Sequence, residues 1–367
     1  MKQGWEYKKL GEVCTKGSSN ISLNKIEENN GEYALFGASG YVKGIDFYHQ
    51  DQSYIGVVKD GSGVGRVDIY PEKSSLVGTM QYIFPKAGCE LGYLKYLLQG
   101  LHLEKYKTGA AIPHIYFRDY ENCKVRVPKK EEQQKIVSEL DLLSGVIEKQ
   151  KAQLAELDKL AQSIFYDMFG DPVTNEKGWE VKKIKDICKV ITGNTPSRNN
   201  LEYYNEEYIE WIKTDNILRD SLYPSLAKEY LSEEGAKQGR IADVGSILIA
   251  CIAGSLESIS KCCLLNRKVS FNQQINALVP KEDMNSLFVY SLVNAIADYI
   301  RENTTNGMKH IITKSVLEEI RICVPPLSLQ QDFAAKVEAI EAMKAKVRQS
   351  LKEAETLFNE RMDYYFN

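Results

Sequence analysis

Apolar residues recur at alternating steps of four and three in two stretches of the chain, 128–170 and 325–367. This seven-residue period, with Glu, Lys and Gln at the positions between, is typical of a coiled-coil helix. Each helix would have about 38 residues and a length of about 57 Å. The seam positions are Ile136, Leu140, Leu143, Ile147, Gln150, Leu154, Leu157, Ala161, Ile164 and Met168 in the first stretch, and Phe333, Val337, Ile340, Lys344, Val347, Leu351, Ala354, Phe358, Arg361 and Tyr365 in the second.

The segments before the two helices also repeat. Trp5-Glu6-Tyr7-Lys8-Lys9-Leu10-Gly11-Glu12-Val13-Cys14 returns 174 residues later (179 minus 5) as Trp179-Glu180-Val181-Lys182-Lys183-Ile184-Lys185-Asp186-Ile187-Cys188. The helices themselves are 197 residues apart (324 minus 127, from Val127 to Val324), so the second copy is longer by 23 residues (197 minus 174). This duplication predicts globular domains at 1–127 and 171–324, each followed by its helix at 128–170 or 325–367.

Both globular domains have the pattern of mixed α/β (α+β) folds. Short runs rich in β-branched and aromatic residues predict strands, and longer apolar-periodic runs predict helices. The expected strands are 53–58, 64–70, 81–84, 247–251 and 275–280, and the expected helices are 91–101 and 284–302.

Connectivity predicts the direction of the long helices. The first helix ends where the second globular domain begins, so the second helix must run back if the two are to pack together, which makes them antiparallel. Residues whose numbers sum to about 495 would then face each other, bringing Gln150 close to Lys344 as a tolerated polar contact or a register device. The C-terminus would finish beside the first domain, in a nearly circular, pseudo-two-fold arrangement.

Composition indicates a soluble chain with real hydrophobic cores: 367 residues, 43% of them hydrophobic. Residues 1–5 contain no apolar signal core, and the longest apolar run, 247–253, is too short for a membrane helix, so we expect a cytoplasmic location. The formal net charge is −3, divided as +2 for 1–127, −2 for 128–170, −2 for 171–324 and −1 for 325–367. If nucleic acid is bound, local clusters or a partner must supply the positive potential.

We find no pattern that predicts catalysis or a metal site. The eight cysteines form no Cys-x-x-Cys pair, which favours reduced, mostly buried thiols. The glycine-rich stretch 59–66 lacks the Gly-Lys-Ser/Thr ending of a phosphate loop and is interpreted as a turn between strands. Glu6-x-Lys8 lacks the upstream aspartate of a metal-dependent nuclease, and no methyltransferase signature is present. The four histidines have no evident nucleophile partner, so we expect no catalytic residues, metal or cofactor in this chain.

Polar loops of the two globular domains are the remaining candidates for function. Arg can recognise guanine, and Asn or Gln adenine, by paired hydrogen bonds in the DNA major groove. The candidate DNA-binding residues are Lys43, Lys59, Ser62, Arg66, Lys107 and Thr108 in the first domain, and Asn194, Thr195, Ser197, Arg198, Lys213, Asn216, Asn272, Gln273 and Gln274 in the second.

The chain as a whole resembles the specificity subunit of type I restriction-modification systems. Three landmarks carry the resemblance: the domain start Trp5-Glu6-x-Lys8-x-Leu10-Gly11-Glu12, repeated at Trp179; the helix entry Val324-Pro325-Pro326-Leu327-x-x-Gln330-Gln331, echoed by Val127-Pro128 with Gln133-Gln134; and the loop Gly193-x-Thr195-Pro196-Ser197. The first helix entry departs from the pattern, with Lys129-Lys130 in place of Pro-Leu.

The resemblance implies a non-catalytic subunit that binds double-stranded DNA. Each globular domain would recognise one half of an asymmetric, interrupted site, and the helices would set the gap between the halves. Two methyltransferase subunits using S-adenosylmethionine would dock on the chain, and a nuclease-translocase subunit using ATP with Mg²⁺ would complete the complex. Two alternatives remain open: a protein-interaction scaffold built on the coiled coil, and a stand-alone DNA-modifying enzyme whose residues follow no recognised pattern.

Overall fold

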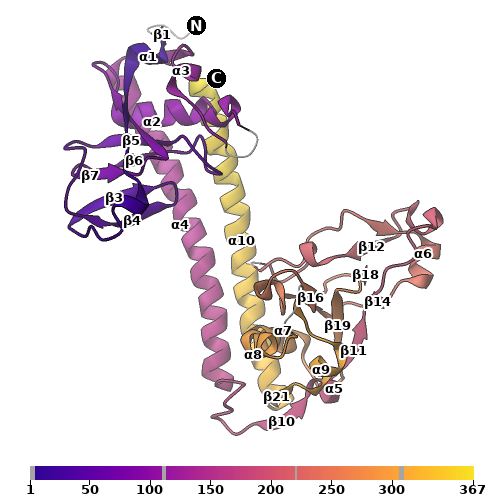
Figure 1. Cartoon of the computed structure of the whole chain (residues 1–367). Helices are drawn as coiled ribbons and strands as arrows, with labels where there is room; N and C mark the ends of the chain where they lie inside the picture. The colour runs from indigo at the N-terminus through magenta and orange to yellow at the C-terminus, as the bar shows by residue number, and fades with distance from the viewer. Residues whose placement is uncertain (1–4, 110–112, 220, 306–309) are drawn as a thin grey trace. The chain divides into compact units, whose positions relative to one another are not determined.

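The computed structural model describes residues 5–109, 113–219, 221–305 and 310–367. The chain divides into two compact units (Figure 1): unit 1 comprises Met1–Ala152 and Arg348–Asn367, and unit 2 comprises Gln153–Val347. Each unit therefore contains one globular domain and parts of both long helices, α4 (Lys130–Phe169) and α10 (Leu327–Phe366). Within the described residues, no helix has the length and apolar character needed to cross a membrane.

Unit 1 is built on a four-stranded antiparallel sheet, in the order β2-β8-β5-β6, whose strands carry the buried residues of its core. A second sheet, β4-β3-β7, has its own small core, and a two-stranded ribbon joins the two ends of the domain. The elements are β1 (Glu6–Lys9), α1 (Leu10–Val13), β2 (Cys14–Ser18), η1 (Leu23–Lys25), β3 (Tyr33–Gly37), β4 (Gly40–Ile45), β5 (Tyr54–Val58), β6 (Val67–Tyr70), β7 (Ser74–Leu76), β8 (Met80–Pro85), α2 (Leu91–Gly100), η2 (Leu103–Tyr106), α3 (Phe117–Tyr120) and β9 (Lys124–Val127).

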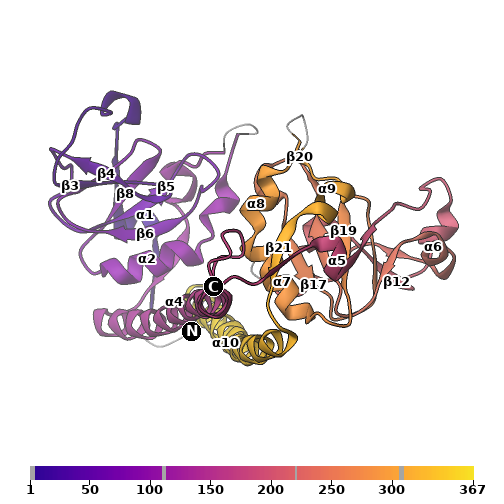
Figure 2. The same ribbon diagram turned by 90° about the horizontal axis from the view of Figure 1, so that it is seen from below.

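The four-stranded sheet and the two-stranded ribbon of unit 1 form a frame that unit 2 repeats. In unit 2 the sheet is β11-β19-β15-β17 and the ribbon is β10-β21. Helices α7 and α8 pack on this sheet (Figure 2). Phe288 of α7 also contacts Phe165 and Phe169 of α4. The elements are β10 (Glu180–Lys183), α5 (Ile184–Ile187), β11 (Cys188–Thr192), η3 (Leu201–Tyr204), β12 (Ile209–Ile212), η4 (Thr214–Asn216), β13 (Tyr230–Leu231), α6 (Glu233–Gln238), β14 (Ile241–Ala242), β15 (Ile247–Ala250), β16 (Ile252–Ala253), η5 (Leu256–Ser258), β17 (Cys262–Leu264), β18 (Val269–Phe271), β19 (Ile275–Pro280), α7 (Ser286–Ala295), α8 (Ala297–Glu302), β20 (His310–Ile311), α9 (Lys314–Glu319) and β21 (Arg321–Val324).

Most of the additional length of the second copy lies between β11 and β15. The offset between equivalent strands is 174 at β2 and β11 (188 minus 14) and rises to 193 at β5 and β15 (247 minus 54). The inserted residues belong to the region that forms the distal sheet of unit 2, β13-β12-β18-β14, where unit 1 has the smaller sheet β4-β3-β7. The two units thus share a frame and differ in the sheet attached to it.

The segments of α4 and α10 run antiparallel within each unit, as predicted. In unit 1, Gln150 Nε2 donates to Ser350 Oγ (2.6 Å) and Arg361 Nη2 donates to Glu139 Oε2 (2.9 Å). In unit 2, Lys344 Nζ lies 2.6 Å from Asp158 Oδ1. As residue numbers rise along one helix, those of their partners fall along the other.

The predicted register is wrong by about one helical turn. Paired residues have numbers that sum to 500 (150 and 350, 139 and 361) instead of about 495, so Gln150 and Lys344 each have another partner within their own units. Contacts at the helix ends explain the difference: Phe165 and Phe169 pack around Phe333 in unit 2. These aromatic contacts, and not simple end-to-end overlap, set the alignment.

Both helix ends meet the domains predicted for them. In unit 1, Arg126 Nη2 donates to the carbonyl oxygen of Asn367 (2.6 Å), and the rings of Tyr93 and Phe366 lie 5.5 Å apart. In unit 2, Trp179 Nε1 donates to the carbonyl oxygen of Phe169 (2.8 Å). The repeated tryptophan at the second domain start therefore fastens that domain to the end of α4.

The strand predictions 53–58, 81–84, 247–251 and 275–280 are confirmed by β5, β8, β15 and β19. Two boundaries differ. The strand expected from residue 64 begins at Val67, because Gly65 has φ +90° and still belongs to the preceding turn. The helix expected over 284–302 divides into α7 and α8 at Ile296, whose φ of −96° and ψ of 15° end the first helix.

Candidate nucleic-acid interface

The predicted polar loops of the second domain meet at the distal sheet of unit 2. The loop after β11 bonds to the end of β18 through Asn194 N and Phe271 O (3.1 Å). The loop after β18 bonds to β12 through Asn272 N and Ile212 O (3.0 Å). Gly193 fits this junction because a Cβ atom there would lie 2.1 Å from the carbonyl oxygen of Asn272. Candidates from three separated stretches are therefore brought together.

An aromatic corner holds the side chain of Arg198. The rings of Tyr204 and Trp211 meet edge to face with centroids 6.2 Å apart, and the guanidinium carbon of Arg198 lies 4.4 Å from the first and 4.7 Å from the second. Both rings also bond to the loop that carries Arg198: Tyr204 donates its hydroxyl to Pro196 O (2.6 Å), and Trp211 Nε1 donates to Asn194 O (3.3 Å). Cation–π attraction and these hydrogen bonds fix loop and side chain together.

Glu229 bridges the two cations of the cluster. Its carboxylate accepts from Arg198 Nη2 (2.5 Å) and also from Lys213 Nζ, which lies 4.9 Å from the Trp211 ring centroid. Burial alone would raise the pKa of Glu229, but the hydrogen bonds from Lys213 and Arg198 outweigh it and the pKa lies below its ordinary value. Glu229 is therefore ionised at neutral pH, and the three side chains together keep one positive charge.

The predicted amides mostly hold the loops in place. Asn194 donates to Gln238 O (2.7 Å) and accepts from Arg240 N (2.7 Å), and Asn216 bonds to Lys213 N, Ser225 and Leu226. Asn272 and Gln274 bond to each other, while the exposed Thr195 donates to the exposed Gln273. Ser197 is exposed on the same loop as Arg198. These contacts leave Arg198, Ser197, Thr195 and Gln273 as the exposed candidates, with Lys213 half-buried beside them.

In unit 1 the predicted residues are less concentrated. The glycine-rich stretch 59–66 is a turn between β5 and β6, as expected, and Ile115 N donates to Lys59 O (2.9 Å). Thr108 exchanges two backbone hydrogen bonds with His114 (2.9 Å each), which places the second loop beside the first. Lys59 is paired with Asp60 (2.6 Å). The exposed members of this group are Ser62, Arg66, Lys107 and Thr108.

Lys43 lies apart from those two loops. It is on β4, where its Nζ donates to the carbonyl oxygens of Ile26 (3.2 Å) and Glu27 (2.9 Å). The ammonium group thus stabilises a surface loop of the small sheet.

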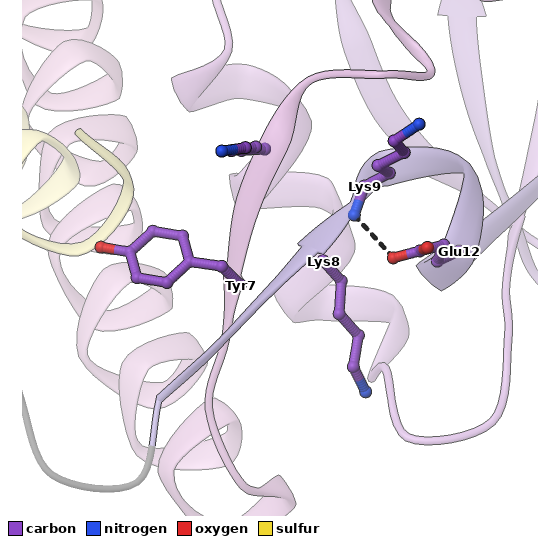
Figure 3. A pocket seen from close by; sticks show the side chains of 5 residues that line it. Tyr7, Lys8, Lys9 and Glu12 are labelled. Carbon is purple, nitrogen blue, oxygen red and sulfur yellow. Dashed lines mark hydrogen bonds between the residues drawn. The ribbon is translucent and has the colours of Figure 1, made fainter.

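The Glu-x-Lys repeat forms an exposed edge and not a catalytic site. Glu6 pairs with Lys8 (2.9 Å), and Glu180 with Lys182 (3.3 Å). Figure 3 shows this ribbon in unit 1, where Lys9 N donates to Glu12 (2.8 Å) at the start of α1. A shallow groove here is lined by Tyr7, Lys8, Lys9, Glu12 and Lys124.

Nothing in the described part of the chain gathers three or more His, Cys, Asp or Glu side chains in the manner of a metal site. Cys14 and Cys188, at equivalent positions of the two copies, are both buried, and burial raises the pKa of each thiol to about 12. Neutral buried thiols of this kind pack in a core and are poor nucleophiles.

Sequence reasoning missed Tyr204, Trp211 and Glu229. They lie up to 31 residues from Arg198 (229 minus 198), in η3, in β12 and just before β13. No short motif connects them. An arginine in a loop followed by an aromatic-rich segment was the only available signal, and it is common in loops without function.

A family model described as the type I restriction modification DNA specificity domain matches residues 2–159 and 176–355. The chain is 24% identical over 281 residues to the MjaIX specificity subunit of Methanocaldococcus jannaschii, covering 70% of this chain and 64% of that protein. It is 22% identical over 258 residues to the EcoR124I/EcoR124II specificity subunit of Escherichia coli, covering 68% and 63%. The matches thus span less than two thirds of these relatives.

Solved structures share the fold. A crystal structure of the type I restriction-modification S subunit from M. genitalium has a TM-score of 0.63 at 13% identity, covering all of this chain (100%) and 97% of the other. A chain from a study of complex assembly and conformational transition in the type I system has a TM-score of 0.57 at 16% identity, covering 98% and 97%.

Proposed function

Because the chain belongs to the type I restriction-modification DNA specificity family, we propose that it is the DNA-recognition subunit of such a complex and performs no catalysis itself. It would act in the cytoplasm, on double-stranded DNA. One observation carries the proposal: the family match occurs twice, and each match, 2–159 and 176–355, contains one globular domain and part of the helix that follows it.

The two domains would recognise different sequences. Their frames are equivalent, but β4-β3-β7 in unit 1 is replaced by the larger β13-β12-β18-β14 in unit 2. Different distal sheets present different side chains, so the two half-sites of the target would be unlike, in contrast to the palindrome bound by a homodimer.

Partner subunits would supply the chemistry. Two methyltransferase subunits would bring S-adenosylmethionine, and a nuclease-translocase subunit would bring ATP and Mg²⁺. The long helices offer exposed apolar residues at equivalent positions for two similar contacts: Val146 (37% exposed) and Met343 (46%), and Leu160 and Leu357 (45% each). These equivalent residues would lie in the two surfaces on which the methyltransferase subunits dock. Shared phosphate contacts would also explain why a DNA-binding chain has a net charge of −3.

The proposal is tested by mapping methylated adenines. We expect that a host lacking adenine methylation, given this chain and its methyltransferase subunits, acquires methylation at one motif with two unlike half-sites and a fixed gap. The same host with the methyltransferase subunits alone is the control. Methylation that does not depend on this chain, or that falls on a palindrome, would refute the proposal.

A further inference from the structure

We propose that Arg198 recognises a guanine in the half-site bound by unit 2, and that Glu229, Tyr204 and Trp211 are positioning residues that hold its guanidinium for that contact. The inference rests on the proposed function and assigns one base contact within it.

Arg198 has an exposed side chain that is nevertheless held in a fixed geometry. The side chain of Arg198 is 50% exposed, yet it contacts two rings and a carboxylate. A solvated arginine with no binding role needs none of these contacts, whereas a side chain that must meet a base edge benefits from losing its freedom before binding. The rings are themselves bonded to the loop at Pro196 and Asn194, which ties the loop that carries Arg198 to the aromatic corner.

Arg198 has more donors than its bond to Glu229 uses. A guanidinium has five N–H donors in a planar fork. The bond to Glu229 uses Nη2, so other donors of the group remain for a ligand. Guanine offers O6 and N7 as two acceptors side by side in the major groove, which matches such a fork.

The charges around Arg198 favour a base over a phosphate as its ligand. The groove beside Arg198 is lined by Glu206, Glu207 and Glu229 as well as by Lys228. Arg198 and Lys213 pair with Glu229, and Glu206 and Glu207 offset the remaining positive charge, so the groove lacks the positive excess that a track for the phosphate backbone requires. The uncharged edge of a base pair requires no such excess. Lys213 supports the assignment because it shares Glu229 and keeps that carboxylate in place.

The experiment uses the complete methyltransferase complex containing the full chain. Methylation is measured on duplexes that carry the mapped motif and on duplexes with each base pair of the second half-site replaced in turn. We expect the second half-site of the wild-type motif to contain a guanine whose replacement strongly reduces methylation. Arg198→Ala should reduce discrimination at that one position by about tenfold or more, with the first half-site unchanged.

Two further variants separate positioning from charge. Arg198→Lys retains the cation but lacks the fork, so it should keep overall affinity while losing discrimination at the same guanine. Glu229→Gln should lower discrimination at that position by a smaller factor. Glu234→Gln, which removes the exposed partner of Lys237 (2.5 Å) on α6 in the same domain, is the matched control and should leave discrimination unaltered.

The inference would be overturned by a second half-site with no guanine, by an even loss of methylation across all duplexes in Arg198→Ala, or by a Glu229→Gln protein that binds every sequence more tightly. The last would identify Glu229 as a competitor of phosphate. A wild-type complex without any chain-dependent motif would refute the proposed function as well, whereas a normal motif unaffected by Arg198→Ala would refute this inference alone.

Discussion

At the scale of single residues, the duplicated glutamines show why a polar pair recurs at both helix entries. Gln133 (0% exposed) donates to Gly88 O and Pro128 O, and its Oε1 accepts from Glu90 N. Gln330 (1% exposed) donates to Pro325 O and accepts from Asn285 N. Each amide satisfies buried backbone groups of two segments and joins the start of a long helix to the globular domain. Lys129-Lys130 does not alter this geometry.

Replacing the buried amide should therefore destabilise unit 2. Gln330→Leu leaves the N–H of Asn285 and the carbonyl of Pro325 without their partner, at a cost of about 1–3 kcal/mol. Urea unfolding followed by tryptophan emission measures it, because Trp179 and Trp211 both lie in unit 2. Gln331→Leu, at the exposed neighbouring position, is the control. Equal unfolding midpoints for the two variants would show that the buried hydrogen bonds contribute nothing.

At the scale of elements, the long helices combine an apolar seam with one buried cation. The side chain of Lys344 is only 6% exposed, and it pairs with Asp158 (2.6 Å) and Glu341 (2.5 Å). A buried ammonium is tolerated only with such partners, whereas an apolar side chain of similar length needs none. Within unit 2, this pairing therefore favours the alignment of α4 and α10 in which Lys344 meets Asp158.

We expect Lys344→Met to change the free energy of unfolding of unit 2 by about 1 kcal/mol or less. The variant loses the ion pairs, but it also no longer bears the cost of desolvating a buried ammonium group. The double variant Asp158→Asn with Glu341→Gln should lower the free energy of unfolding by about 2 kcal/mol, because it leaves the buried Lys344 ammonium without a carboxylate partner. The loss is moderate because Asp158 is half-exposed and its ion pair is partly screened by solvent. Amide hydrogen exchange along α10 measures both. A larger loss of stability in Lys344→Met than in the double variant would contradict this account.

At the scale of the whole molecule, duplication supplies two equivalent frames and divergence supplies two different distal sheets. Helices α4 and α10 each have 40 residues and continue without a break from one unit into the other. On the proposed function, their length is the property that sets the gap between half-sites.

One added heptad in each helix, between Ala152 and Gln153 and between Val347 and Arg348, should therefore lengthen the preferred gap. Seven residues add about 10 Å, which corresponds to about three base pairs. Adenine methylation mapping measures the new motif, and a heptad added to α10 alone is the control that should impair activity by breaking the register. A changed base preference within either half-site would show that the helices do not set the gap.

Much of the fold follows from local pattern. The heptads placed both long helices to within a few residues, and the strands β5, β8, β15 and β19 were evident from short apolar runs. The repeated Trp-Glu-x-Lys segment forms equivalent strands, β1 and β10, in the two copies. These features are encoded by neighbouring residues, so periodicity suffices to find them. The convergence of the polar loops of the second domain at one sheet was not evident from the sequence.

Contacts between distant segments account for the remainder. The alignment of α4 with α10 depends on Phe165, Phe169 and Phe333, which no heptad count can pair. The corner around Arg198 joins residues from a loop, a short helix and two strand ends, and Glu229 enters it only because β13 lies beside β12. Hydrophobic period is a property of the chain alone, whereas register and the meeting of side chains come from packing in three dimensions.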